Sequence, residues 1–307
     1  MKYSFAVAAL GASSMVSARA TSPIVKRQAA ITDVDILNYA LTLEHLESKF
    51  YREGLANYSQ AAFIQAGFPD PFYKYLEEVS FDEDTHVSFL AGALGSAAVA
   101  ECTYSFPSTD PASFVALASV LEGVGVSAYL GAAASIASPA YLTAAGSILT
   151  IEARHNAYIR SALAQIPFPQ PFDAPLTFNE VYTLASSFIV SCPSTNAALP
   201  VKAFPSLVLG TKGAIKSGDT ITLLTPGYML VPASGVGPIY AAFIAVTGPT
   251  LVEAYPVDGG FTVVVPAGFN GQTYVVLTGC KDSVTDDSIS AGPAIIEITN
   301  ASPSKST

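Results

Sequence analysis

Hydrophobic residues recur at helical spacing through the first part of the chain. In residues 33–54 apolar side chains return every three or four positions, Asp33 can cap the segment and Gly54 can end it. Three more long segments and one short segment follow the same pattern, at about residues 71–98, 110–137, 139–165 and 177–190. Four long helices with short connections predict an antiparallel bundle over residues 30–195.

After about residue 195 the pattern changes to short β-branched and aromatic runs separated by Gly, Pro and Asn. Examples are "DTITLLT", "PIYAAFIAV" and "QTYVVLTG". The stretch "VVVPAGFNGQTYVVL" predicts a hairpin with Asn270-Gly271 in its turn region. About seven such strands indicate a small β-sandwich-like domain over residues 196–300. The fold class expected for the whole chain is therefore multidomain α + β.

The first residues have the composition of a secretory signal. A Lys near the start is followed by an apolar run, and Ala18-Arg19-Ala20 has the form of a signal-peptidase site. We expect a signal peptide over residues 1–20, with an N-terminal anchor as the alternative. Lys26-Arg27 resembles a dibasic processing site, which makes residues 21–27 a propeptide. The expected location is extracellular, either secreted or in the cell wall.

Charge and hydropathy exclude some partners. The net charge is −10, and only 12% of the residues are charged against 50% hydrophobic residues. Nucleic-acid binding requires clustered Lys and Arg, so it is not expected. The long apolar run at 113–151 is interrupted by Glu122 and Pro139, so no transmembrane segment is expected. Cell-wall association and a homo-oligomer stay open.

Three cysteines and two sequons suit an oxidising compartment. We favour a Cys102–Cys192 disulfide, because each residue follows a predicted helix of the same domain. A Cys192–Cys280 bond is the alternative. Asn57 and Asn300 are candidate glycosylation sites, and Pro303 weakens the second.

Acidic residues and histidines inside the apolar helices carry the chemistry. Two helices each contain one Glu, and the other two each contain a Glu-x-x-His pair, whose members share one helical face. This is the ligand set of di-iron and di-manganese carboxylate bundles. The candidate metal ligands are Glu44, Glu83, His86, Glu122, Glu152 and His155. Two divalent ions close together need bridging carboxylates, so the expected cofactors are two Fe or Mn ions.

A repeated spacing supports the choice of Glu44 over Glu47. Tyr51 follows Glu44 by seven residues, and Tyr129 follows Glu122 by seven. The repeat indicates a bundle built from two similar halves. We interpret Glu47 as a surface or interfacial residue. Tyr51 and Tyr129 are candidates for hydrogen bonds to ligands or for redox chemistry, with packing as the alternative.

Other charged residues lie beside the candidate ligands. Asp84 and Arg154 are candidates for orienting the ligands, with plain surface positions as the alternative, and Asp82 flanks Glu83 in the same way. His45 adjoins Glu44, so on a helix it points about 100° away from the site.

At the level of motifs, the chain resembles a known family. The stretches "DVDILNYALTLEHLESKFYREG", "EEVSFDEDTHVSFLAGAL" and "ILTIEARHNAYIR" look like those of secreted fungal ferritin-like domain proteins. That family is related to fungal stress-response and late-sexual-development proteins and to plant desiccation-related proteins. The resemblance covers about residues 30–195. It implies a ferritin-like bundle and a dinuclear metal site, and it does not imply a cage.

Three functions are consistent with these features. The first is a dinuclear metalloenzyme with oxidase, peroxide-decomposing or ferroxidase-type activity. The second is a metal-binding or stress-protective protein without turnover. The third is a structural cell-surface protein in which the β-rich domain binds partners and the bundle is a scaffold.

Overall fold

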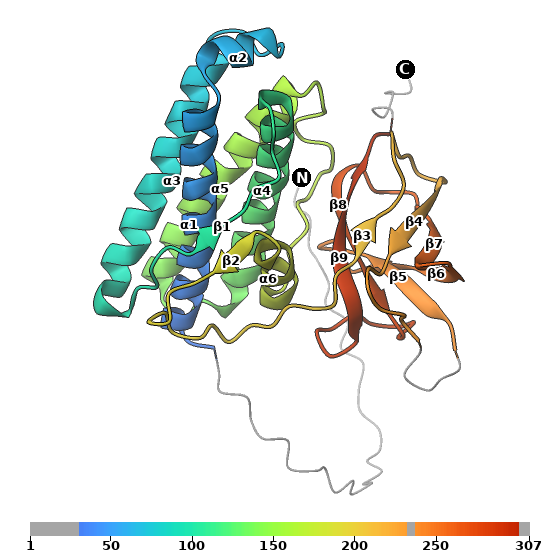
Figure 1. Ribbon diagram of the computed structural model, residues 1–307. Helices are drawn as coiled ribbons and strands as arrows, with labels where there is room; N and C mark the ends of the chain where they lie inside the picture. The colour runs from blue at the N-terminus through green and yellow to red at the C-terminus, as the bar shows by residue number, and fades with distance from the viewer. Residues whose placement is uncertain (1–30, 232–236, 301–307) are drawn as a thin grey trace, which may run out of the picture. The chain divides into compact units, whose positions relative to one another are not determined.

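Six α-helices lie in the part of the chain that the computed structural model describes, residues 31–231 and 237–300 (Figure 1). They are α1 (Asp33–Asn57), α2 (Gln60–Gln65), α3 (Phe72–Leu94), α4 (Pro111–Ala132), α5 (Pro139–Ala162) and α6 (Phe178–Ser186). All five predicted helices are present, and the short α2 was not predicted. The predicted signal peptide and propeptide, residues 1–27, lie outside the described residues.

The ends of α1 differ from those expected. Thr32, and not Asp33, is the N-cap, and it forms a capping box with Asp35. The Asp33 carboxylate instead accepts hydrogen bonds from the N–H groups of Ala137 and Ser138, at 2.8 and 2.9 Å. The helix does not end at Gly54 but continues to Asn57.

The direction of the helices shows one long crossover. The Asn38 side chain, near the start of α1, bonds to Ala97 O and Val99 N, just after the end of α3. Asp33 is likewise joined to the segment after α4. Helices α3 and α4 are therefore both antiparallel to α1, and residues 95–110 must run the length of the bundle between them. The prediction of short connections is wrong here.

A small sheet and a disulfide hold the crossover in place. Strand β1 (Thr103–Tyr104) pairs antiparallel with β2 (Ile189–Ser191), which follows α6. The adjacent Cys102 and Cys192 form the disulfide that the sequence favoured. Cys280 is exposed and free, which excludes the alternative pairing.

One helical segment among the described residues, Pro111–Ser135, is long and apolar enough to cross a membrane by composition alone. This segment contains α4, and 67% of its most apolar window is buried within the protein. A helix that is apolar on all sides is typical of the core of a bundle.

Among the described residues after the bundle, seven strands form one antiparallel sheet, in the order β3-β4-β7-β6-β5-β8-β9. Their bounds are β3 (Val208–Leu209), β4 (Thr220–Leu224), β5 (Ile239–Phe243), β6 (Thr250–Val257), β7 (Gly260–Val264), β8 (Gly271–Thr278) and β9 (Ile289–Ile298). Strand β6 pairs with β5 through residues 250–254 and with β7 through residues 255–257, so the sheet bends there. A bridge between Ile215 and Ile298 lies near the two edges. The sheet is nearly closed and barrel-like, in place of the predicted two-layer sandwich.

The predicted hairpin around Asn270-Gly271 is wrong. Strand β7 pairs with β4 and β6, whereas β8 pairs with β5 and β9. The tight hairpin lies one strand earlier, where Asp258-Gly259 joins β6 to β7 and Gly259 has φ +72°. Strand pairing between distant segments outweighed the local turn signal.

Polar contacts join the helices to the sheet. Arg160 on α5 is 2% exposed and forms two hydrogen bonds to Glu297 on β9, at 2.7 and 3.0 Å. The Tyr274 hydroxyl on β8 donates to the carbonyl oxygen of Gly123 on α4, at 2.8 Å. These contacts attach β9 to α5 and β8 to α4.

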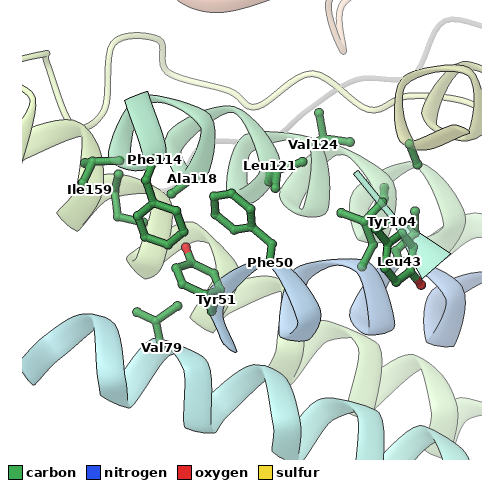
Figure 2. Packing of buried hydrophobic residues seen from close by; sticks show 14 of the residues in the cluster. Leu43, Phe50, Tyr51, Val79, Tyr104, Phe114, Ala118, Leu121, Val124 and Ile159 are labelled. Atoms are coloured by element: carbon green, nitrogen blue, oxygen red, sulfur yellow. The ribbon is translucent and has the colours of Figure 1, made fainter. Parts of the chain in front are cut away.

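Aromatic packing fixes the distance between α1 and α4. The rings of Phe50 and Phe114 stack with centroids 4.5 Å apart, and Figure 2 shows them between the two helices. Gly54 makes this packing feasible, because a Cβ there would lie only 1.9 Å from Phe114 Cε2. The residue expected to end α1 thus serves helix packing.

We predict that Gly54→Ala lowers the free energy of unfolding by about 1–3 kcal/mol, because the added methyl group overpacks the ring of Phe114. Gly92→Ala on α3 is the control, because nothing lies within 4 Å of its added Cβ. It should raise the unfolding free energy by about 0.5–1 kcal/mol through helix propensity. Chemical denaturation measures both. Equal effects of the two substitutions would contradict the packing role of Gly54.

Candidate metal centre

Four glutamates meet halfway along the bundle. Glu44, Glu83 and Glu122 each lie eleven residues after the first residue of their helix, and Glu152 lies thirteen after the start of α5. Each of these positions is near the middle of its helix. The four glutamates therefore lie at the same level along the bundle, whether neighbouring helices are parallel or antiparallel. All four are 0% exposed.

The structure brings all six predicted ligands together in two groups. One group consists of Glu44, Glu83, His86 and Glu152, and the other of Glu83, Glu122, Glu152 and His155. Within each group, one donor atom per residue lies within 4.8 Å of the others. Glu83 and Glu152 belong to both groups. The arrangement therefore contains two adjacent groups of possible metal ligands that share two carboxylates.

Both histidines point the same nitrogen at the glutamates. His86 Nδ1 lies 3.2 Å from Glu44 Oε2 and from Glu83 Oε2, and 3.4 Å from Glu152 Oε1. His155 Nδ1 lies 3.1 Å from Glu83 Oε1 and 3.4 Å from Glu122 Oε2. The i, i+3 spacing within each Glu-x-x-His pair produces this convergence.

Unpartnered buried atoms concentrate in this cluster. Among the described residues, six buried side-chain atoms lack a hydrogen-bond partner. Five of them are Glu83 Oε1, Glu122 Oε2, both oxygens of Glu152, and His155 Nδ1. Buried polar atoms are ordinarily satisfied, and a buried carboxylate without a partner is costly. Carboxylate oxygens and imidazole nitrogens are ligands for iron and manganese, so the donor set fits two such ions.

The two tyrosines make reciprocal hydrogen bonds across the bundle. The Tyr51 hydroxyl on α1 donates to Glu122 Oε1 on α4, and the Tyr129 hydroxyl on α4 donates to Glu44 Oε1 on α1. Burial, and next the charge of the glutamate that each contacts, raise the pKa of both phenols well above the ordinary value. Each hydroxyl therefore keeps its proton and orients one carboxylate.

Asp82, and not Asp84, contacts a candidate ligand. Its Oδ2 lies 3.1 Å from His155 Nε2, the ring nitrogen on the far side from the glutamates. A carboxylate at this position fixes the ring and its tautomer. Asp84 instead accepts a hydrogen bond of 2.6 Å from the Ser48 hydroxyl and lies 3.8 Å from Arg52 Nε. Helical spacing placed both aspartates beside the site and did not distinguish them.

Arg154 and His45 lie outside the cluster. Arg154 is exposed on α5 and forms no side-chain hydrogen bond or ion pair with any described residue, so the structure gives it no orienting role. His45 Nε2 lies 3.2 Å from Val99 O, away from the glutamates as expected.

Glu47 is a fifth buried glutamate, and its interpretation as a surface or interfacial residue is wrong. It is only 4% exposed. A Cβ on Gly125 would lie 3.0 Å from both Glu47 Oε1 and Glu152 Oε2, so the absence of a side chain at Gly125 leaves room for two carboxylates. Glu47 lies three residues after Glu44, so it shares the inward face of α1. That spacing was the signal in the sequence.

Burial dominates the electrostatics of the cluster. Desolvation raises the pKa of Glu83 to about 7 and raises the pKa values of Glu47 and Glu152 well above the ordinary value. Burial alone would lower the pKa of His155, but the nearby carboxylates of Glu122 and Glu83 raise it to about 11. The metal-free cluster thus retains protons, and divalent ions would replace them.

The two predicted glycosylation sites have different surroundings. Asn57 is exposed at the last position of α1. The Asn300 amide donates to Ser217 Oγ and to Phe269 O, at 3.0 and 2.7 Å. A glycan on Asn300 would displace these contacts, whereas one on Asn57 would meet solvent. Glycosylation stays a prediction at both positions.

Comparison with known proteins agrees with the geometry. Residues 32–165 match the model of a family described as a ferritin-like domain. The match spans α1 to α5 and therefore all six candidate ligands. The helical part of this chain is therefore similar to a ferritin-like domain, the fold that the resemblance implied.

A fungal protein is similar over a longer stretch. The chain is 27% identical over 177 residues to Protein rds1 of Schizosaccharomyces pombe. The aligned part is 58% of this chain and 44% of that protein, so the chain spans less than half of that relative's length.

We predict that Tyr51→Phe and Tyr129→Phe each weaken Mn²⁺ or Fe²⁺ binding by about 10- to 100-fold, the usual effect of removing a hydrogen bond that orients a ligand. The two effects should be similar, because each variant frees one carboxylate. Competition with a chromophoric chelator measures the affinity. Tyr141→Phe is the control, because the Tyr141 hydroxyl makes no hydrogen bond to a described residue. Unchanged affinity in both test variants would contradict the orienting role.

Proposed function

We propose that this chain is a ferritin-like protein that binds two iron or manganese ions between α1, α3, α4 and α5. One observation carries the proposal. Two donor groups share Glu83 and Glu152, contain four glutamates that are 0% exposed, and include five of the six unpartnered buried side-chain atoms in the described part of the chain. Protons or cations must compensate such a cluster, and its shape matches two adjacent cations.

The ligands divide into three roles. Glu83 and Glu152 would contact both ions, because each belongs to both groups. Glu44 with His86 would complete one position, and Glu122 with His155 would complete the other. Four glutamates offset the charge of two divalent ions, and each histidine adds a neutral donor.

When bound, two such ions would supply redox chemistry, with one electron from each for the two-proton reduction of one peroxide to two waters. Other residues of the chain orient the ligands and exclude water. Tyr51 and Tyr129 hold the carboxylates of Glu122 and Glu44 in place. Asp82 holds the ring of His155. The apolar core that includes Leu43, Val79 and Leu121 keeps bulk water from the carboxylates.

We also propose that the protein acts outside the cell, either secreted or in the cell wall. The composition of residues 1–20 supports this location. The Cys102–Cys192 disulfide supports it too, because such bonds persist in oxidising compartments. A stress- or development-related role without catalysis is the alternative and is an outcome of the experiment below.

We predict that the purified protein carries about two Fe or Mn ions per chain, as expected for this ligand set. Inductively coupled plasma mass spectrometry measures the metal content. Glu83→Gln combined with Glu152→Gln should reduce it to near zero, because both cation positions lose a shared ligand. Circular dichroism checks that the variant is folded.

The matched control is Glu78→Gln, an exposed glutamate on the same helix as Glu83, and it should keep the full metal content. A wild-type protein that stays metal-free after incubation with Fe²⁺ and with Mn²⁺ would contradict the proposal. If the metal-loaded protein does not consume peroxide, the result favours the alternative, a stress- or development-related role without catalysis.

A further inference from the structure

A cavity of about 360 Å³ lies beside the proposed metal centre. Its walls come from α1, α4, α6 and the sheet region. They are mostly apolar and include Leu43, Leu46, Val124, Leu184, Phe204 and Ile295. Cavities of this size with apolar walls and a few placed polar groups are typical of small-molecule binding sites.

Glu47 is a buried and unpartnered polar group in this cavity. Its side chain lines the wall and is 4% exposed, and its oxygens make no hydrogen bond to any residue that the structure describes. The hydroxyl of Thr183, also in the wall, is already used: it donates to Asn179 O at 2.6 Å and accepts from Phe204 N at 2.9 Å. A ligand in the cavity would therefore meet the Glu47 carboxyl group as a buried and available polar partner.

The cavity adjoins a shared metal ligand. Glu47 and Gly125 both line it, and a Cβ on Gly125 would lie 3.0 Å from Glu152 Oε2. Gly125 follows Glu122 by three residues, just as Glu47 follows Glu44. The two halves of the bundle thus differ here, with a carboxylate on α1 and bare backbone on α4. The backbone at Gly125 leaves the cavity close to Glu152.

We propose that this cavity binds a small, mainly apolar molecule whose hydrogen-bond-donating head group, an amine or an alcohol, contacts Glu47. The apolar walls select the body of the ligand, and the Glu47 carboxyl group accepts the head group. A carboxylate ligand is disfavoured, because it would approach Glu47 and Glu152 in an apolar surrounding. That the bound molecule is a substrate of the metal centre rests on the proposed function, whereas its binding does not.

Isothermal titration calorimetry of the full-length, metal-loaded protein tests the proposal with n-hexylamine, n-hexanol and hexanoate. The amine and the alcohol share a six-carbon chain and differ in charge, so they separate the two kinds of head group. At least one of them should bind, and hexanoate should not. Glu47→Gln should weaken n-hexylamine binding at least tenfold, because an amide, unlike a carboxyl group, cannot ionise to pair with the ammonium group. It should leave n-hexanol binding within threefold.

Val120→Phe places a large ring in the cavity wall and should abolish binding of both probes. Ser206→Phe, from the opposite wall, is a second filling variant in case the first does not fold. Val264→Phe is the matched control, because Val264 is an exposed residue of β7 outside the cavity. It should bind as the wild type does.

The results distinguish this inference from the proposed function. A metal-loaded protein that binds neither n-hexylamine nor n-hexanol, or that binds them equally well with the cavity filled, overturns the ligand site alone. A protein that takes up neither Fe²⁺ nor Mn²⁺ but still binds the probes in the Glu47-dependent manner keeps the ligand site and overturns the proposed metal centre.

Discussion

Four carboxylates buried at the centre of a helical bundle are the constraint on which the rest of the structure depends. Glu44, Glu83, Glu122 and Glu152 are 0% exposed, and the net penalty of burying an uncompensated ion is several kcal/mol. No apolar contact offsets that penalty, so the fold must supply positive charge at this point. Two Nδ1 atoms and two tyrosine hydroxyls converge there, and the remaining unpartnered oxygens face one another. A pair of divalent cations satisfies this geometry.

The bundle has two similar halves, and the differences between them are informative. Each half contributes a glutamate and, seven residues later, a tyrosine that bonds to the glutamate of the other half. His155 has the Asp82 carboxylate behind its ring, whereas His86 Nε2 has no hydrogen-bond partner among the described residues. Glu47 has only Gly125 as its counterpart. The two proposed cation positions are therefore not equivalent, and the cavity lies on the side of Glu47.

The candidate ligands could be predicted from the sequence because their signal is local. Glu-x-x-His pairs inside apolar helices share a face whatever the connections are. Features that depend on distant segments were missed. Nothing in residues 95–110 shows that they cross the bundle, since β1 is defined by its pairing with residues 189–191. The strands were recognised, but their order depends on non-local pairing, so a sandwich and a local hairpin were predicted in place of one bent sheet. Glu47 was misassigned because it shares one face of α1 with Glu44, and the sequence of α1 alone does not show that both can be buried. The space for the Glu47 carboxylate comes from Gly125 on the neighbouring helix α4.

Anomalous X-ray diffraction from crystals of the metal-loaded protein, recorded at the absorption edge of the bound metal, tests the central claim most directly. The account predicts two neighbouring anomalous peaks that both contact Glu83 and Glu152. One peak should also contact Glu44 and His86, and the other Glu122 and His155. A single peak, or peaks away from these six residues, would contradict it.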